Sequence, residues 1–291
     1  ESFMNLRPIH GAASAALAII ASFGPNTRAD DIEYRTTSLS DTVSMVQARG
    51  GNVAVSAGED GVFIIDDQYK PSIDQLLAAI GSISDSPVRF VINTHYHGDH
   101  VGGNEVIGEA GAVIIAHDNI RKRMTTEQVS IFMNSTTPPY PQGALPVLTF
   151  NDRISLHFNG ESATAYYVAN GHTDGDSIIH FPESNVLHMG DIYFNGLYPY
   201  IDLDAGGTIQ GMIGAVELGL ELADEDDPEY GALLRVLTAT GARRGPARAV
   251  RDAVRRRRAA APAGVRARPA GTGHRLCRPQ GCAGPDPAAG L

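Results

Sequence analysis

Apolar positions along this chain follow two periods, one typical of β-strands and one typical of amphipathic helices. Short runs rich in β-branched residues occupy 52–57 and 61–66, and the Gly- and Asp-containing segment between them predicts a hairpin. Residues 71–80 instead carry apolar side chains at helical spacing between Pro71 and Gly81, which predicts a helix. The same two periods predict strands at 88–93, 112–116, 153–158, 163–168, 177–181 and 185–189, and helices at 104–110, 117–124 and 207–223.

The predicted strands fall into two groups, and each group is interrupted by helices. A segment with four prolines, 135–146, predicts a loop between the groups. This order favours a layered α/β protein with two sheets inside and helices outside.

Composition is that of a globular protein, with 43% hydrophobic and 19% charged residues. The formal net charge is -10, although the last sixty residues are strongly basic, so the body of the chain is acidic. An acidic body does not attract nucleic acid, whose phosphates require a basic face. We therefore expect a small-molecule substrate and no nucleic-acid partner; the oligomeric state stays open.

The first 29 residues resemble a secretory signal peptide. A short basic segment, Met4–Arg7, precedes about thirteen small or apolar residues that are too few to span a bilayer. This pattern predicts cleavage near Ala29 and a periplasmic or secreted protein that leaves the membrane when the signal is removed. An amphipathic N-terminal helix is the alternative.

Residues 228–291 differ in kind from the domain that we expect at 30–227. They are rich in Ala, Arg, Gly and Pro, contain no Lys, and show no sustained period. We favour a frameshift near Asp226 in a GC-rich gene. The alternative is a genuine disordered basic arm, with Arg255–Arg258 as a nucleic-acid patch. The two cysteines, Cys277 and Cys282, both lie in this tail, so no Cys-based zinc site supports the body.

Three histidines and one aspartate occupy six positions directly after the strand predicted at 88–93. In extended backbone the side chains of His95 and His97 point to the same side and can hold one ion together. Asp99 and His100 follow on the turn beyond and can face a second ion. The spacing therefore predicts a metal site.

This cluster, His-x-His-x-Asp-His at residues 95–100, resembles the signature of the metallo-β-lactamase superfamily. Gly171–Ser177 is similar to the next ligand loop of that family, with His172 as its histidine, and Met189–Asp191 is similar to the ligand strand that follows. The resemblance implies an α/β fold, the four-layer αβ/βα sandwich of this superfamily. The implied zinc ligands are His95, His97 and His172 for one ion, Asp99 and His100 for the other, and Asp191 between them.

The implied chemistry is hydrolysis of a carbonyl compound. Two zinc ions can share a hydroxide, lower its pKa toward neutrality and polarise the carbonyl, while Asp99 orients the hydroxide and handles its proton. The superfamily normally supplies one more histidine near 228–231, where this chain has Tyr230, so we expect a weakened second zinc site and an aberrant or incomplete C-terminal part.

The identity of the substrate follows less directly from the sequence. Many β-lactamases of the superfamily have a Cys where this chain has Asp191 and a Lys where it has Phe194. The intervals between His97, His172 and Asp191 are nevertheless similar to those of secreted class B β-lactamases. We therefore expect hydrolysis of a cyclic amide such as a β-lactam, with Asn195 as a substrate contact. The alternatives are a thioester or lactone hydrolase similar to glyoxalase II, and a metal-binding but inactive product.

Overall fold

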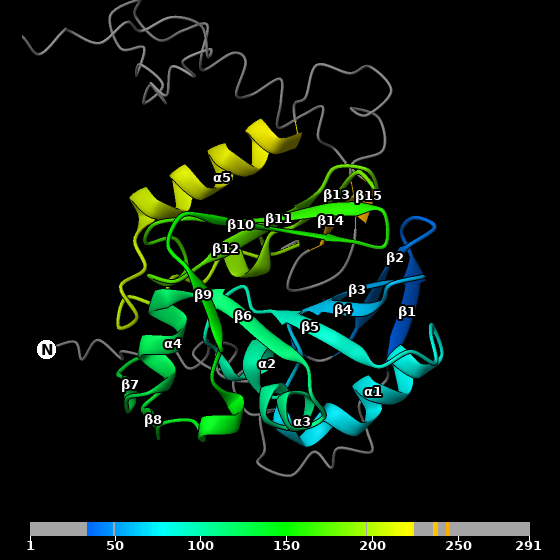
Figure 1. Cartoon of the computed structure of the whole chain (residues 1–291). Coiled ribbons are helices and arrows are strands. Elements are labelled where there is room, and N and C mark those ends of the chain that lie inside the picture. Colours follow the sequence, from blue (N-terminus) through cyan, green and yellow to red (C-terminus); the bar gives the residue numbers. More distant parts are fainter. Residues whose placement is uncertain (1–33, 49, 196, 224–234, 238–242, 245–291) are drawn as a thin grey trace, which may run out of the picture. The chain divides into compact units, whose positions relative to one another are not determined.

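Two β-sheets lie face to face with helices on their outer sides in the computed structural model (Figure 1). The structure describes residues 34–48, 50–195, 197–223, 235–237 and 243–244. Among them, no helix combines the length and apolar character that a bilayer crossing requires. The four-layer αβ/βα arrangement predicted from the sequence is confirmed.

The first sheet has seven strands in the order β1-β2-β3-β4-β5-β6-β9. Neighbours from β1 to β4 are antiparallel, and β4, β5, β6 and β9 run parallel. The predicted hairpin is confirmed as β3 and β4, paired from Ala54–Ile65 to Gly58–Gly61. The bounds are β1 (Arg35–Ser38), β2 (Val43–Gln47), β3 (Val53–Gly58), β4 (Gly61–Ile65), β5 (Val88–Ile92), β6 (Val113–His117) and β9 (Leu148–Phe150).

The second sheet has six strands in the order β10 to β15, and a separate two-stranded hairpin joins β7 to β8. Its members are β10 (Arg153–Phe158), β11 (Glu161–Tyr167), β12 (Ser177–Phe181), β13 (Val186–His188), β14 (Arg235–Leu237) and β15 (Arg243–Arg244). The hairpin consists of β7 (Gln128–Ser130) and β8 (Ser135–Thr137).

Two short strands fall inside the tail that the sequence sets apart at 228–291. The β14 strand pairs in parallel with β13, and β15 pairs with β14. The other tail residues lie outside the described part of the chain, as does the predicted signal peptide at 1–29, so the frameshift and the leader stay predictions.

The helices lie on the outer faces of the sheets, α1 and α3 on the first and α5 on the second (Figure 1). The segment 135–146, predicted as a loop, contains β8 and a short 3-10 helix. The sequence does not reveal these elements because three residues are too few to show a period. The α-helices are α1 (Ile73–Gly81), α2 (Gly98–Val101), α3 (Asn104–Glu109), α4 (Asp118–Met124) and α5 (Ile209–Ala223). The 3-10 helices are η2 (Lys70–Ser72), η3 (Gln142–Ala144) and η4 (Gly190–Ile192).

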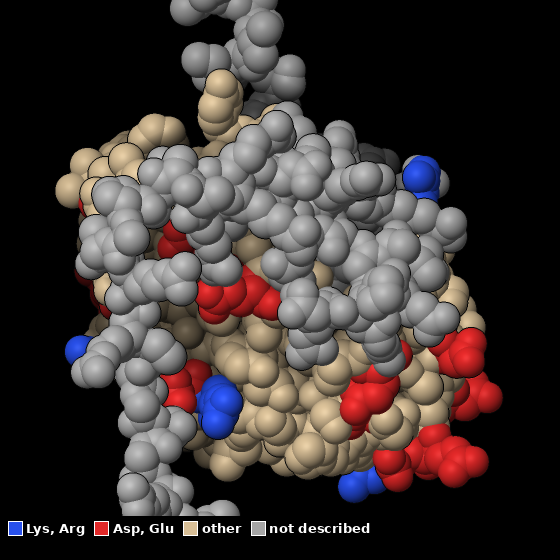
Figure 2. Space-filling model, turned by 90° about the horizontal axis from the view of Figure 1, so that it is seen from above, with Lys and Arg blue, Asp and Glu red and all other residues tan. Residues whose placement is uncertain are grey.

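Acidic side chains dominate the charged surface on the face shown in Figure 2. Asp and Glu cover more of the described surface there than Lys and Arg do. This agrees with the acidic body expected from the composition.

Aromatic side chains hold the two sheets together. The ring of Phe63 on β4 stacks on Phe181 of β12, with centroids 5.9 Å apart and planes 9° from parallel. Phe158 of β10 contacts the same ring edge-on, also at 5.9 Å. Phe63 and Phe181 are fully buried, so this contact removes apolar area of both sheets from water and fixes their spacing.

Replacing Phe63 with Ala tests this inter-sheet contact. We expect the free energy of unfolding to fall by about 3 to 5 kcal/mol, because a large buried ring leaves a cavity. Urea denaturation followed by circular dichroism measures it. Val147→Ala, at a position with 70% exposure, is the control and should change stability by less than about 0.5 kcal/mol. Equal effects of the two substitutions would contradict this role of Phe63.

Candidate metal centre

The site lies at the edge where the parallel strands of the first sheet end. The segment 95–100 follows β5 after two residues, and its last three positions begin α2. From the second sheet, His172 lies in the loop between β11 and β12, and Asp191 follows β13. Ligand sites form at the carboxyl ends of parallel strands because the loops there converge.

Three imidazole nitrogens meet at this edge. His95 Nε2 lies 3.1 Å from His97 Nδ1, and His172 Nε2 lies 2.9 Å from the same His97 atom. The structure thus brings His95, His97 and His172 together as one group that could hold a metal ion. Three nitrogen donors with a position left for water are typical of a catalytic rather than a structural zinc site.

A second group consists of His95, His100 and Asp191. His100 Nε2 lies 3.3 Å from Asp191 Oδ1, and both atoms are buried without a hydrogen-bond partner in the described part of the chain. Buried polar atoms without partners are costly, and a cation between them would satisfy both. The donor set therefore fits a metal ion at this position too.

Asp191 and Asp99 occupy different places around these groups. Asp191 Oδ2 lies 3.7 Å from His172 Nε2 and 4.0 Å from His95 Nε2, so its carboxylate lies between the two groups. Asp99 Oδ2 lies 3.5 Å from His100 Nε2, and its side chain is 24% exposed, facing the pocket described below. Asp99 is near the second group without being one of its three members.

Asp202 orients His97 from behind. Its Oδ2 lies 2.8 Å from His97 Nε2, which leaves Nδ1 facing the other two imidazoles. The Tyr96 hydroxyl donates to the same oxygen at 3.3 Å, and the Arg123 guanidinium lies over the Tyr96 ring at 5.3 Å. Arg123 is in turn fixed by two hydrogen bonds to Asp174, of 2.6 and 2.8 Å.

In each of the other three imidazoles, the ring nitrogen that faces away from the metal-binding groups also has a polar partner. His172 Nδ1 donates a hydrogen bond of 2.8 Å to the Tyr200 carbonyl oxygen, so Nε2 is left to act as a ligand to a metal. His100 Nδ1 lies 2.7 Å from Asp66 Oδ2, and His95 Nδ1 lies 3.1 Å from Thr94 Oγ1. Such partners fix the tautomer and the ring orientation of a metal ligand.

Asp66 and Asp202 are functional residues that the sequence reasoning missed. Asp66 ends the strand predicted at 61–66. A carboxylate directly after a buried apolar run is a sequence signal that could have marked it as a site residue. Asp202 lies thirty residues beyond His172 with no motif around it, and only the fold brings it to His97.

The electrostatics favour metal binding at neutral pH. Burial lowers the pKa of His172 to about 4, helped by His97 and opposed by Asp191. Burial and the neighbouring His100 and His172 also lower the pKa of His95. Both imidazoles are therefore unprotonated at pH 7, as a metal ligand must be.

For the carboxylates, the neighbouring histidines outweigh burial in setting the pKa. Burial disfavours the charged form of Asp191, but His100 and His172 outweigh it and lower the pKa. In the same way His100 and His97 overcome the burial of Asp99 and lower its pKa. Although burial opposes it, the pKa of His100 is raised by Asp99, Asp191 and Asp66. This imidazole lies where the surrounding charges attract a cation.

Two glycines let the backbone approach the ligands closely. A Cβ on Gly51 would collide with the His100 ring, and one on Gly50 would lie 2.8 Å from the Asp99 Cβ. A side chain at Gly51 would therefore displace His100 from the second group.

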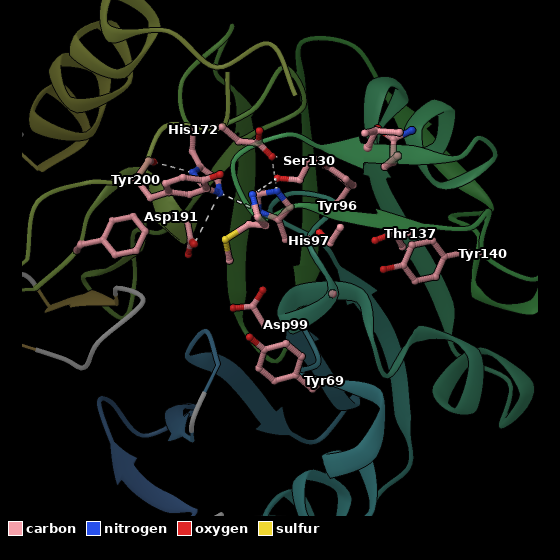
Figure 3. A pocket seen from close by; sticks show the side chains of 17 residues that line it. Tyr69, Tyr96, His97, Asp99, Ser130, Thr137, Tyr140, His172, Asp191 and Tyr200 are labelled. Carbon is pink, nitrogen blue, oxygen red and sulfur yellow. Dashed lines mark hydrogen bonds and ion pairs between the residues drawn. The ribbon is translucent and has the colours of Figure 1, made fainter. Parts of the chain in front are cut away.

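Three members of the two groups, His97, His172 and Asp191, line a pocket of about 300 Å³. Figure 3 shows Asp191 and Tyr200 on one side of it, Tyr140 and Thr137 on the other, and His97 between them. Most lining residues come from 96–99, from the β7–β8 hairpin and from the segment 191–202, and Tyr69, Tyr140 and His172 complete the set. The whole set is Tyr69, Tyr96, His97, Gly98, Asp99, Gln128, Val129, Ser130, Met133, Ser135, Thr137, Tyr140, His172, Asp191, Phe194, Tyr200 and Asp202.

The predicted substrate contact, Asn195, is half-buried and does not belong to this lining set. Its neighbour Phe194 does line the pocket, as Tyr200 does. The segment that contains Tyr230, where the sequence suggests a missing zinc ligand, lies outside the described residues, so a weakened second site stays a prediction.

A family model of the metallo-β-lactamase superfamily matches residues 46–259, more than half of the chain. The chain therefore belongs to the metallo-β-lactamase superfamily, and it carries a histidine cluster that could hold a metal ion. The match continues past residue 227, where we place the end of the domain from sequence.

Solved structures show the same fold. A metallo-β-lactamase from Pontibacter korlensis is similar with a TM-score of 0.56 and 16% identity, covering 72% of this chain and 92% of that one. The DIM-1 metallo-β-lactamase is similar with a TM-score of 0.55 and 15% identity, covering 72% and 91%.

Curated relatives match over shorter stretches. A hydroxyacylglutathione hydrolase from Erythrobacter litoralis is 28% identical over 108 residues, 37% of this chain and 35% of the relative. The alpha subunit of a 2,4-dinitroanisole O-demethylase from Nocardioides sp. is 27% identical over 143 residues, 48% and 40% respectively. The matched region thus spans well under half of the length of either relative.

Asp202→Asn tests the orientation of His97. We expect zinc affinity at the first group to fall about 10- to 100-fold, because the imidazole loses the carboxylate that fixes its tautomer. Competition with a chromophoric chelator measures the affinity. Asp204→Asn is the control, since Asp204 accepts a hydrogen bond from the Ile131 backbone and, among the described residues, forms no hydrogen bond or ion pair with a candidate metal ligand. The same loss in both variants would show that Asp202 acts only through loop structure.

Proposed function

We propose that this chain is a zinc-dependent hydrolase that cleaves a small cyclic amide or ester. The observation that supports this most strongly is that the ring nitrogens of His95 and His172 lie 3.1 and 2.9 Å from His97 Nδ1. Beside them, His100 Nε2 and Asp191 Oδ1 are buried and make no hydrogen bond in the described part of the chain. Nitrogen and carboxylate donors suit zinc, and the pocket gives a substrate access to them.

Zinc at such a site lowers the pKa of water toward neutrality and polarises a substrate carbonyl. The protein's own residues supply orientation and proton handling. Asp99 is ionised at neutral pH and lines the pocket, so its carboxylate can orient the attacking water, accept its proton and return it to the leaving group. Asp202, Tyr200 and Asp66 keep the imidazoles in place during this step.

Two substrate classes follow from different observations. The similar solved structures are metallo-β-lactamases, which makes a β-lactam the first candidate. The relative named hydroxyacylglutathione hydrolase, and an Asp rather than a Cys at position 191, support a thioester or lactone instead. We further propose that the enzyme acts outside the cytoplasm on a small molecule and not on nucleic acid, as the leader-like N-terminus and acidic body suggest.

Turnover of a chromogenic β-lactam, a γ-lactone and a thioester by the purified zinc-loaded chain tests this proposal. We expect at least one to be hydrolysed, and His97→Ala to lower the rate by more than about 100-fold, because one of three nitrogen donors is lost. His157→Ala removes an exposed histidine of β10 and should leave the rate unchanged.

Two results would contradict the proposal. Activity that survives both a chelator and His97→Ala would exclude a role for the metal. Zinc bound at the histidines without turnover of any of the three substrates would indicate the inactive product.

A further inference from the structure

The β7–β8 hairpin forms one wall of the pocket. Among its residues, Val129 and Met133 line the pocket while keeping 57% and 65% of their surface exposed. The tip of the hairpin carries two more apolar side chains, Ile131 at 79% and Phe132 at 76% exposure, which do not belong to the lining. An exposed apolar cluster at a pocket mouth typically marks a binding surface.

Two contacts hold this hairpin next to the loop that follows Asp191. The Ile131 backbone N–H donates to Asp204 Oδ2 at 2.7 Å, and the rings of Phe132 and Tyr200 lie 5.7 Å apart. Tyr200 also lines the pocket, and its carbonyl oxygen accepts a hydrogen bond from His172 Nδ1. The apolar wall is thereby fixed relative to the metal-binding groups.

The charged residues of the pocket lining are acidic, which limits the charge that a substrate can carry. None of the seventeen described residues that line it is Lys or Arg, and the charged side chains there, apart from histidine, are the aspartates 99, 191 and 202. A carboxylate on the far side of the substrate from the metal would have no cationic partner and would lose hydration. Aromatic rings, among them Tyr69, Tyr140 and Phe194, surround the remaining space.

Accepting the proposed hydrolase function, we propose that the substrate is uncharged and carries an apolar group of several carbons beside the scissile carbonyl. Between the two substrate classes above, this favours a neutral lactone or thioester over a β-lactam that bears a carboxylate. This group lies against Val129 and Met133, which make the β7–β8 hairpin the specificity-determining element. The competing interpretation is that the hairpin tip binds a partner or a membrane. It predicts that Ile131 and Phe132 contribute to that binding and that Val129 and Met133 do not affect substrate choice.

Three esters with one leaving group separate these ideas. They are 4-nitrophenyl acetate, 4-nitrophenyl hexanoate and mono-4-nitrophenyl adipate, of which the last places a carboxylate where the hexanoate has a methyl group. With zinc-loaded protein we expect kcat/KM for hexanoate to exceed that for acetate and for adipate by about 10-fold each. Met133→Gln should reduce the hexanoate-to-acetate ratio about 10-fold, and Ile131→Gln should leave it unchanged.

An adipate ester hydrolysed as fast as the hexanoate would overturn the proposal. So would an equal effect of Ile131→Gln and Met133→Gln on this ratio, since the chain-length preference would then not depend on the residues that line the pocket. Zinc content and circular dichroism of each variant exclude loss of the fold as the cause. Hydrolysis without chain-length preference would refute the substrate class alone, whereas no hydrolysis of these esters or of the three earlier substrates would refute the hydrolase function.

Discussion

The two β-sheets meet at the edge that carries the candidate metal centre, and a 2.8 Å hydrogen bond from the Ser177 backbone N–H to the Thr94 carbonyl joins them there. Thr94 precedes the first histidine of the cluster, and Ser177 begins β12 just after the His172 loop. The stacked Phe63 and Phe181 fix the same spacing deeper in the core. His97 and His172 approach within 2.9 Å because this junction holds their loops.

Rigid sheets alone would not form the metal centre, because the orientation of each imidazole ring must also be fixed. The four imidazoles are held at the nitrogen that faces outward, by a carboxylate, a carbonyl or a hydroxyl, and point the other nitrogen inward. Burial keeps His95 and His172 unprotonated, while the neighbouring His100 lowers the pKa of Asp99 and Asp191 and keeps them ionised. The centre thus presents the neutral nitrogens of His95 and His172 together with anionic oxygens, which is the combination a divalent cation requires.

The sequence predicts the strongest parts of this arrangement because they are local. His95 and His97 lie two positions apart directly after β5, so their convergence follows from the period of a strand, and Asp99 and His100 follow at once in α2. Long periodic elements such as α1 and α5, and the β3–β4 hairpin, are predicted close to their observed bounds. His172 and Asp191 lie far along the chain and are reached only through resemblance to a family.

Other features depend on tertiary contacts that no local pattern encodes. Asp202 reaches His97 across 105 positions, and β1, exposed at all four residues, has no apolar alternation to reveal it. The β7–β8 hairpin consists of two three-residue strands with an apolar tip in solvent, where a sequence pattern predicts a buried element or nothing. The wall of the pocket therefore emerges only from the fold.

X-ray absorption at the zinc edge, on protein loaded with one equivalent of zinc, tests the central claim most directly. The account predicts a first shell dominated by imidazole nitrogens at about 2.0–2.1 Å, without sulfur, that changes on His172→Ala. Scattering from sulfur at about 2.3 Å would contradict it, since Cys277 and Cys282 are the only cysteines and both lie in the tail.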